Sequence, residues 1–187
     1  MVRAVMLMLG PLLVALANDF GTSIAVSGQL AAATFVTLGI TAPLVGPISD
    51  TYGRRPVLLI GVLLMALGVL GSGAAWSYGS LMATRLITGV GLAMLPPTIM
   101  AALADNLPPE KLGKAVGFIH SASWVGVALG VPAIALLGYV GGWRLPFYIT
   151  GGLSLALWVM LYLSLPSGQR RLGQSIDLIN RFKVIGR

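Results

Sequence analysis

Two long runs without a charged residue constrain this chain more than any other feature. The first run covers Leu30–Ile48 and the second covers Val57–Trp76. An α-helix crosses the hydrocarbon core of a bilayer with roughly 20 apolar residues, so each run is long enough to span a membrane. A short polar island that contains Asp50, Arg54 and Arg55 connects the two runs. The island therefore predicts a tight turn between two membrane-spanning helices.

The composition of the whole chain agrees with a membrane protein. Hydrophobic residues make up 57% of the 187 residues and charged residues 9%, against about 25% charged residues in ordinary soluble domains. The net charge of +7 would suggest nucleic acid as a partner of a soluble protein. In a membrane protein it reflects positive loops on one side, so we expect no nucleic-acid partner. Because the chain has no cysteine and His120 is its one histidine, we expect no metal site and no cofactor.

The same apolar pattern predicts an all-α, polytopic membrane helix bundle within residues 1–166. Beyond the two runs above, the expected full spans are Leu81–Ala104, Ala115–Leu137 and Leu145–Leu165. A further apolar stretch, Ala4–Ala17, is below spanning length. It follows Arg3 and ends in small residues, so it also resembles a signal peptide. We favour a shortened first span, which gives five full spans plus one shortened span, and the signal peptide stays open as the alternative.

The polar island has an ordered spacing, Gly46-x-x-x-Asp50-x-x-Gly53-Arg54-Arg55. Asp50 lies at the negative end of the incoming helix dipole, where a carboxylate needs a cationic partner. Arg54 and Arg55 can supply that partner across the turn. The pattern resembles the signature loop of the major facilitator superfamily, which lies between the second and third helices of that family. The resemblance implies a cytoplasmic loop whose aspartate and arginines belong to a gate.

Arg85 is the one charge well inside a predicted span. An arginine at mid-membrane costs roughly 2.5–3.5 kcal/mol on insertion scales, so Arg85 must face a partner or a water-filled cavity. The alternative is an arginine whose long side chain reaches the outer end of the helix. Arg85-x-x-x-Gly89-x-Gly91 resembles a second motif of the superfamily. That resemblance implies a role for Arg85 in proton coupling.

The fifth predicted span carries a packing motif. Gly126-x-x-x-Gly130 predicts a close-packing helix face, and Pro132 predicts a kink in the same helix. Together with the range Gly142–Arg144, this pattern is similar to the sugar-efflux and arabinose-efflux type members of the superfamily. We expect His120, on the same span, to be a hydrogen-bonded packing residue rather than a proton carrier.

Basic residues gather on one side of the predicted topology, which holds the N-terminus, the second and fourth connections, and the tail. They are Arg3, Arg54, Arg55, Lys111, Lys114, Arg170, Arg171, Arg181, Lys183 and Arg187. The positive-inside rule places both termini of this multi-pass protein in the cytoplasm, with the spans in the cell (inner or plasma) membrane. In the tail, residues 167–187, apolar residues recur every three or four positions. This predicts a basic amphipathic linker segment on the membrane surface, with a disordered linker as the alternative.

The resemblance covers nearly the whole chain and implies the N-terminal six-helix half of a transporter, built as a 3+3 inverted repeat. It implies proton-coupled efflux, as in an antiporter, of a small organic solute such as a drug or sugar. The expected partners are the lipid bilayer, the small-molecule substrate, protons and a second six-helix half, either a separate chain or a second copy. We expect no enzyme, because no His or acidic cluster is placed for chemistry. A non-transporting membrane scaffold stays open, because every acidic residue falls at a loop or helix end: Asp19, Asp50, Asp105, Glu110 and Asp177.

Overall fold

The computed structural model describes residues 2–164, and over that range the chain is a bundle of helices without a strand. The chain begins with α1 (Val2–Leu7), the 3₁₀ turn η1 (Gly10–Leu12) and α2 (Leu13–Asp19). The remaining helices are α3 (Ile24–Tyr52), α4 (Arg54–Gly73), α5 (Tyr78–Asn106), α6 (Pro109–Gly141) and α7 (Arg144–Ser164). Within the described residues, six helical stretches are apolar and long enough to cross a membrane. The predicted all-α membrane bundle is therefore confirmed. The predicted tail segment, residues 167–187, lies outside the described residues.

The first span is one interrupted helix. The stretch Val2–Asp19 has 18 residues and is the shortest of the six found among the described residues. Its break at η1 contains Pro11, which has no N–H to donate, and the Leu12 N–H donates to the Leu9 carbonyl at 3.0 Å. Met8, Leu12 and Leu16 are buried in the core. The first span is therefore part of the packed bundle, and the choice between a shortened span and a signal peptide stays a prediction.

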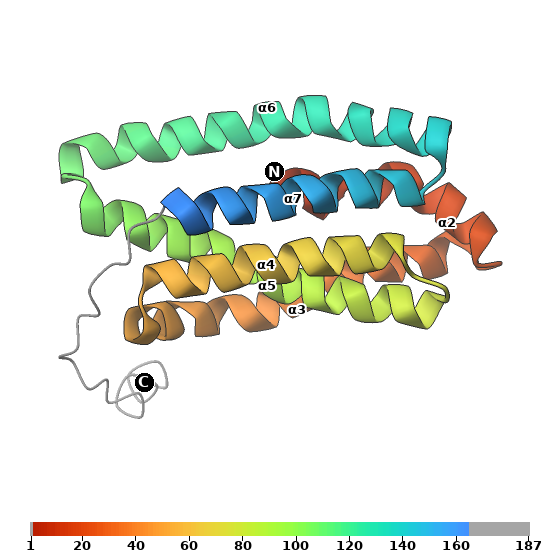
Figure 1. Ribbon diagram of the computed structural model, residues 1–187, viewed down its shortest axis with the longest axis horizontal. Helices are drawn as coiled ribbons and strands as arrows, with labels where there is room; N and C mark the ends of the chain where they lie inside the picture. The colour runs from red at the N-terminus through yellow and green to blue at the C-terminus, as the bar shows by residue number, and fades with distance from the viewer. Residues whose placement is uncertain (1, 165–187) are drawn as a thin grey trace.

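The core lies around α4. This helix packs against α5 and α7, and α5 packs in turn against α3. A side chain at Gly68 would clash with Thr88, and one at Gly91 would clash with the backbone of Met65. Small residues let α4 and α5 approach closely, which is the usual basis of helix association in membranes. Figure 1 shows α3, α4 and α5 along one side of the bundle, α6 along the other side, and α7 between them.

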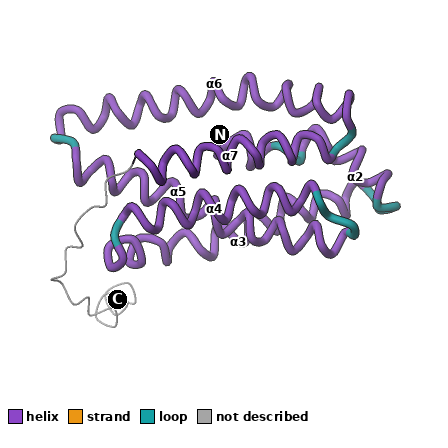
Figure 2. Tube along the Cα trace, in the orientation of Figure 1, coloured by secondary structure: helices purple, strands orange, loops and turns teal. Residues whose placement is uncertain are grey.

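Two helices leave long faces uncovered. Ile134 is the only buried residue of α6, and α3 exposes a row of large apolar side chains that includes Phe35, Val36, Ile40 and Leu44. The connections between neighbouring helices are short (Figure 2), so these faces are not covered by loops. Exposed apolar faces of this size mark contact with lipid or with another protein surface.

The helices extend beyond the predicted apolar runs because polar ends carry no hydrophobic signal. α3 begins at Ile24, where the Ser23 hydroxyl accepts from the Val26 N–H at 3.2 Å and caps the helix. At its other end α3 continues to Tyr52, so most of the predicted polar turn is helical. The reversal between α3 and α4 is made by Gly53 alone. Its φ of +93° is a conformation that glycine adopts without a steric penalty.

Candidate functional site

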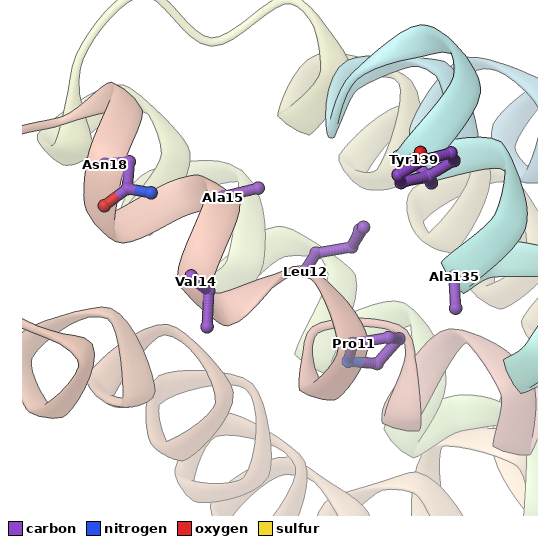
Figure 3. A pocket seen from close by; sticks show the side chains of 8 residues that line it. Pro11, Leu12, Val14, Ala15, Asn18, Ala135 and Tyr139 are labelled. Atoms are coloured by element: carbon purple, nitrogen blue, oxygen red, sulfur yellow. The ribbon is translucent and has the colours of Figure 1, made fainter.

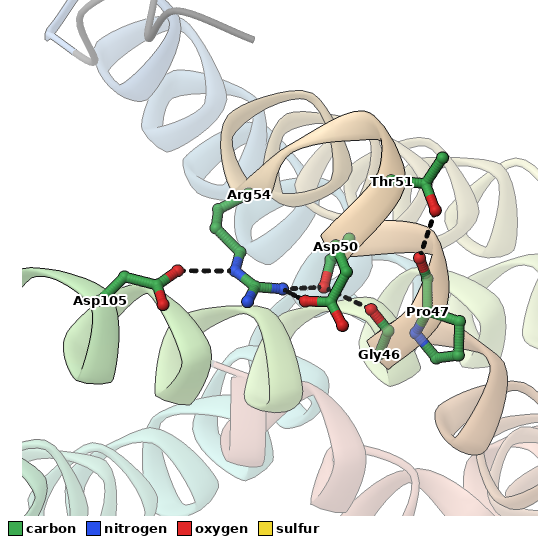
Figure 4. Close-up of polar contacts among 7 residues, drawn as sticks. Gly46, Pro47, Asp50, Thr51, Arg54 and Asp105 are labelled. Carbon is green, nitrogen blue, oxygen red and sulfur yellow. Dashed lines mark hydrogen bonds and ion pairs between the residues drawn. The ribbon is translucent and has the colours of Figure 1, made fainter. Parts of the chain in front are cut away.

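A charged cluster joins three helices at the end of the bundle where α3 meets α4. The Arg54 guanidinium lies 2.5 Å from the Asp50 carboxylate and donates to the Ser49 hydroxyl at 2.6 Å. Its Nε donates to the Asp105 carboxylate, at the end of α5, at 3.0 Å. We call these four residues the Arg54 cluster (Figure 4). One side chain at the start of α4 therefore holds the ends of α3 and α5.

The Arg54 cluster is accessible to solvent. The Arg54 side chain is 27% exposed, and the side chains of Asp50 and Asp105 are 40% and 54% exposed. Ion pairs at such exposure contribute about 0–1 kcal/mol each, because water screens the charges and competes for them. The cluster can therefore hold the helix ends together and still be broken at a low free-energy cost.

The two arginines of the predicted motif contact different helices. Arg54 pairs with Asp50, whereas Arg55 donates to the Tyr162 carbonyl of α7 at 3.1 Å and lies 5.8 Å from the centroid of the Tyr162 ring. Gly46 has open space where a side chain would stand. The gating role of the motif stays a prediction.

Asp105 is the member of the Arg54 cluster that sequence reasoning missed. Its signal was present, because Asp105 is an acidic residue at the end of the fourth span on the side that also carries Arg54. The spacing along the chain does not show that α5 ends beside α4. Only the packing of the three helices brings the second carboxylate to the arginine.

Arg85 lies in the core of the bundle and is 1% exposed. Its Nε and Nη2 donate to the Ser72 hydroxyl at 3.1 and 2.5 Å, and its guanidinium lies 5.0 Å from the centroid of the Phe147 ring. The Ser72 hydroxyl donates in turn to the Gly68 carbonyl at 2.7 Å. Arg85 thus has partners at the end of α4 and near the start of α7, and it is buried between them rather than exposed at the helix ends. Its part in coupling stays a prediction.

At the opposite end of the bundle, Asp19 joins the first span to the α6–α7 connection. The Trp143 indole N–H donates to the Asp19 carboxylate at 3.0 Å, and the Arg144 guanidinium lies 3.4 Å from the same oxygen. The Trp143 ring packs between Phe20 and Phe147 at centroid distances of 5.5 and 5.9 Å. We call Asp19, Trp143 and Arg144 the Asp19 clasp.

The predicted packing motif lies on the side of α6 that meets the first span. A side chain at Gly130 would approach the Ala4 Cβ to 3.2 Å, and α6 continues through Pro132. Whether these residues act together as a motif stays a prediction.

Farther along the same side, α6 and the first span border a hollow of about 460 Å³ (Figure 3). Its lining is mostly apolar, and Asn18 and Tyr139 add polar groups from the two sides. The lining residues are Pro11, Leu12, Val14, Ala15, Asn18, Ala135, Gly138 and Tyr139.

Most of this chain is similar to known membrane transporters. The family model described as Major Facilitator Superfamily matches residues 1–184. The MFS-type transporter YybF of Bacillus subtilis is 28% identical over 163 residues, which cover 87% of this chain and 40% of the relative. The 3-(3-hydroxy-phenyl)propionate transporter of Escherichia coli is 34% identical over 124 residues, 65% of this chain and 30% of the relative. The chloramphenicol resistance protein of Streptomyces lividans is 28% identical over 162 residues, 87% of this chain and 41% of the relative. The chain thus spans about two fifths or less of these relatives.

Proposed function

Because the chain belongs to the major facilitator superfamily, we propose that it forms a six-helix half of a secondary active transporter. The proposed activity is export of a small organic solute in exchange for protons. The relatives are named as transporters and not as enzymes. The observation that carries the proposal is the Arg54 cluster, which joins three spans through exposed ion pairs at one end of the bundle.

The strength of the Arg54 cluster suits a gate. Alternating access in transporters of this kind rocks one half against the other around a site between them. A contact that closes one side must stabilise the closed state and still break in every cycle, and a ligand can shift such an equilibrium only by its difference in affinity for the two states. Two exposed ion pairs of about 0–1 kcal/mol each meet both conditions. The basic residues at this end favour a cytoplasmic position in the cell membrane.

Names of relatives bear on the solute and its direction. One relative is a chloramphenicol resistance protein, which favours export of a small organic molecule. Another is named for 3-(3-hydroxy-phenyl)propionate, also a small organic molecule. Proton coupling rests on the resemblance of Arg85 and its neighbouring glycines to the second family motif. The second six-helix half, as a separate chain or a second copy, completes the proposed transporter.

A split-transporter experiment tests this function. The chain is expressed in drug-sensitive bacteria, alone and with the remaining part of the Streptomyces lividans relative, and cellular accumulation of chloramphenicol is measured with and without a protonophore. We expect reduced accumulation when both parts are present and co-purify, and loss of this effect with the protonophore. Asp50→Asn removes one charge of the Arg54 cluster and should slow export several-fold, whereas Glu110→Gln removes an acidic charge at the start of α6 and should not.

The outcomes separate the parts of the proposal. Export at the unmodified rate by the Asp50→Asn variant would contradict the gating role. Export that persists with the protonophore would contradict proton coupling. Parts that co-purify but leave chloramphenicol accumulation unchanged would favour the alternative of a membrane scaffold.

A further inference from the structure

We propose that Arg3, His120 and Trp124 form a binding site for a small organic carboxylate that carries an aromatic ring. The inference rests on the proposed transport function, because it names the class of solute. Arg3 belongs to the first span, and His120 and Trp124 belong to α6. None of the three residues is part of the Arg54 cluster or of the Asp19 clasp.

The geometry brings a cation, an imidazole and an indole together. The Arg3 guanidinium lies 3.0 Å from His120 Nδ1 and 4.5 Å from the centroid of the Trp124 ring. His120 and Trp124 are four residues apart on α6, so their side chains leave the same face of the helix. Close approach of the two spans is helped by Gly130, which lies against Ala4, the residue next to Arg3.

The site offers hydrogen-bond donors and lacks an anion. When Nδ1 of His120 accepts from Arg3, a neutral imidazole carries its proton on Nε2 and presents a second donor. The guanidinium has five N–H groups, and among residues 2–164 one hydrogen bond, to His120, uses them. The ion pairs among the described residues belong to Arg54 and Arg144, so no carboxylate of that part of the chain pairs with Arg3.

The position in the span makes an unpaired cation costly. His120 lies inside the apolar range Ala115–Leu137 of α6. Its contact with Arg3 therefore places the guanidinium beside this apolar range, and not beside the lysines at the start of α6. Ionisable residues at membrane depth face a water-filled cavity and pair with a charge. His120 is exposed and not packed, contrary to the sequence-based expectation, although it is hydrogen-bonded as expected.

The chemistry of the three side chains selects the ligand. A guanidinium binds a carboxylate through two parallel N–H groups, which is a strong and directional contact. Trp124 is 59% exposed. The Arg3 guanidinium lies over one face of its ring, and the opposite face can stack against an aromatic ring of the ligand. A carboxylate would supply the missing anion, and the indole would supply the apolar contact. An anionic lipid headgroup shares the charge but lacks the ring, so the experiment separates the two sources.

A binding experiment with matched probes tests the site. The purified chain is placed in nanodiscs of zwitterionic lipid, and equilibrium dialysis measures binding of radiolabelled 3-phenylpropionate and of its neutral amide, 3-phenylpropanamide. We expect the acid to bind at least about tenfold more tightly than the amide, as one charge-assisted hydrogen bond implies. Arg3→Gln should abolish this preference and Arg3→Lys should keep part of it. Trp124→Ala should weaken both probes by a similar factor, and Lys114→Gln, a cation removed from the same helix, should change neither.

Each contrary result is informative. Equal binding of acid and amide by the unmodified chain, no binding of the acid, or an undiminished preference in Arg3→Gln would overturn the site. Addition of phosphatidylglycerol should leave acid binding unchanged, and displacement of the acid by this lipid would overturn the solute in favour of a headgroup. Circular dichroism and the elution profile of each variant confirm that it is folded.

Different experimental results overturn the proposed binding site and the proposed transport function. Arg3-dependent binding of the acid, with no export of any solute even when the second half is present and co-purifies, would keep the site and overturn the transporter. Export of neutral chloramphenicol together with binding that is indifferent to Arg3 would keep the transporter and overturn the site.

Discussion

At the scale of single residues, the buried pair of Arg85 and Ser72 should be sensitive to the loss of one oxygen. Ser72→Ala removes the acceptor of two Arg85 N–H groups inside the core. A charged group left without its partner costs at least about 1–3 kcal/mol, so we expect a drop of that size in the free energy of unfolding. Titration with SDS in mixed micelles, followed by circular dichroism, measures the change. Ser121→Ala, on the exposed face of α6, is the matched control, and equal effects of the two variants would contradict the role of the pair.

The motif residues show how far a sequence predicts such contacts. A pairing of Asp50 with an arginine across the turn followed from the order of the charges around Gly53, whereas the choice of Arg54 over Arg55 came only from the structure. The turn at Gly53 followed from a glycine between two spans. Asp105 did not follow, because its contact with Arg54 depends on the side-by-side packing of α4 and α5. Local contacts are encoded by spacing, whereas contacts between helices require the fold.

At the scale of elements, the Asp19 clasp should depend more on its hydrogen bond than on its charge. The carboxylate of Asp19 and the guanidinium of Arg144 are both partly exposed, so their ion pair contributes about 0–1 kcal/mol. The Trp143 side chain is buried, and its indole N–H has Asp19 as acceptor. Asp19→Asn keeps an acceptor oxygen and should destabilise by less than about 1 kcal/mol, whereas Asp19→Ala should destabilise by about 1–3 kcal/mol.

Thermal unfolding in detergent, followed by circular dichroism, distinguishes these two contributions. Glu110→Ala, which removes an acidic residue from the first turn of α6, is the control. Equal destabilisation by Asp19→Asn and Asp19→Ala would show that the charge dominates, contrary to this expectation.

The elements themselves were largely predictable. Long apolar runs mark membrane helices because the bilayer requires every backbone group to be paired within the segment. The same reasoning finds only the apolar middle of each helix, so α3 and α6 extend farther at both ends than their predicted spans. It also cannot show that α6 contributes one residue, Ile134, to the buried core. Which face of an apolar helix is covered depends on its neighbours and not on its own pattern.

At the scale of the whole molecule, the uncovered faces of α3 and α6 predict association. The exposed apolar row on α3 and the uncovered face of α6 are surfaces for a second half or a second copy. We expect the chain in mild detergent to form dimers or larger species, which light scattering measures as protein mass after subtraction of bound detergent. A monomer of this length that transports solutes robustly in proteoliposomes would contradict the proposal of a half transporter.

The Asp19 clasp also has a consequence for biosynthesis. Asp19 and Trp143 are 124 residues apart in the chain, and ribosomes add about 5–20 residues per second. The first span therefore spends about 6–25 s in or near the translocon before its partner is synthesised. During that interval Arg3 and Asp19 have neither His120 nor Trp143 beside them. Assembly of the first span is thus a late, post-insertion event, even though that span leaves the ribosome before the other described helices.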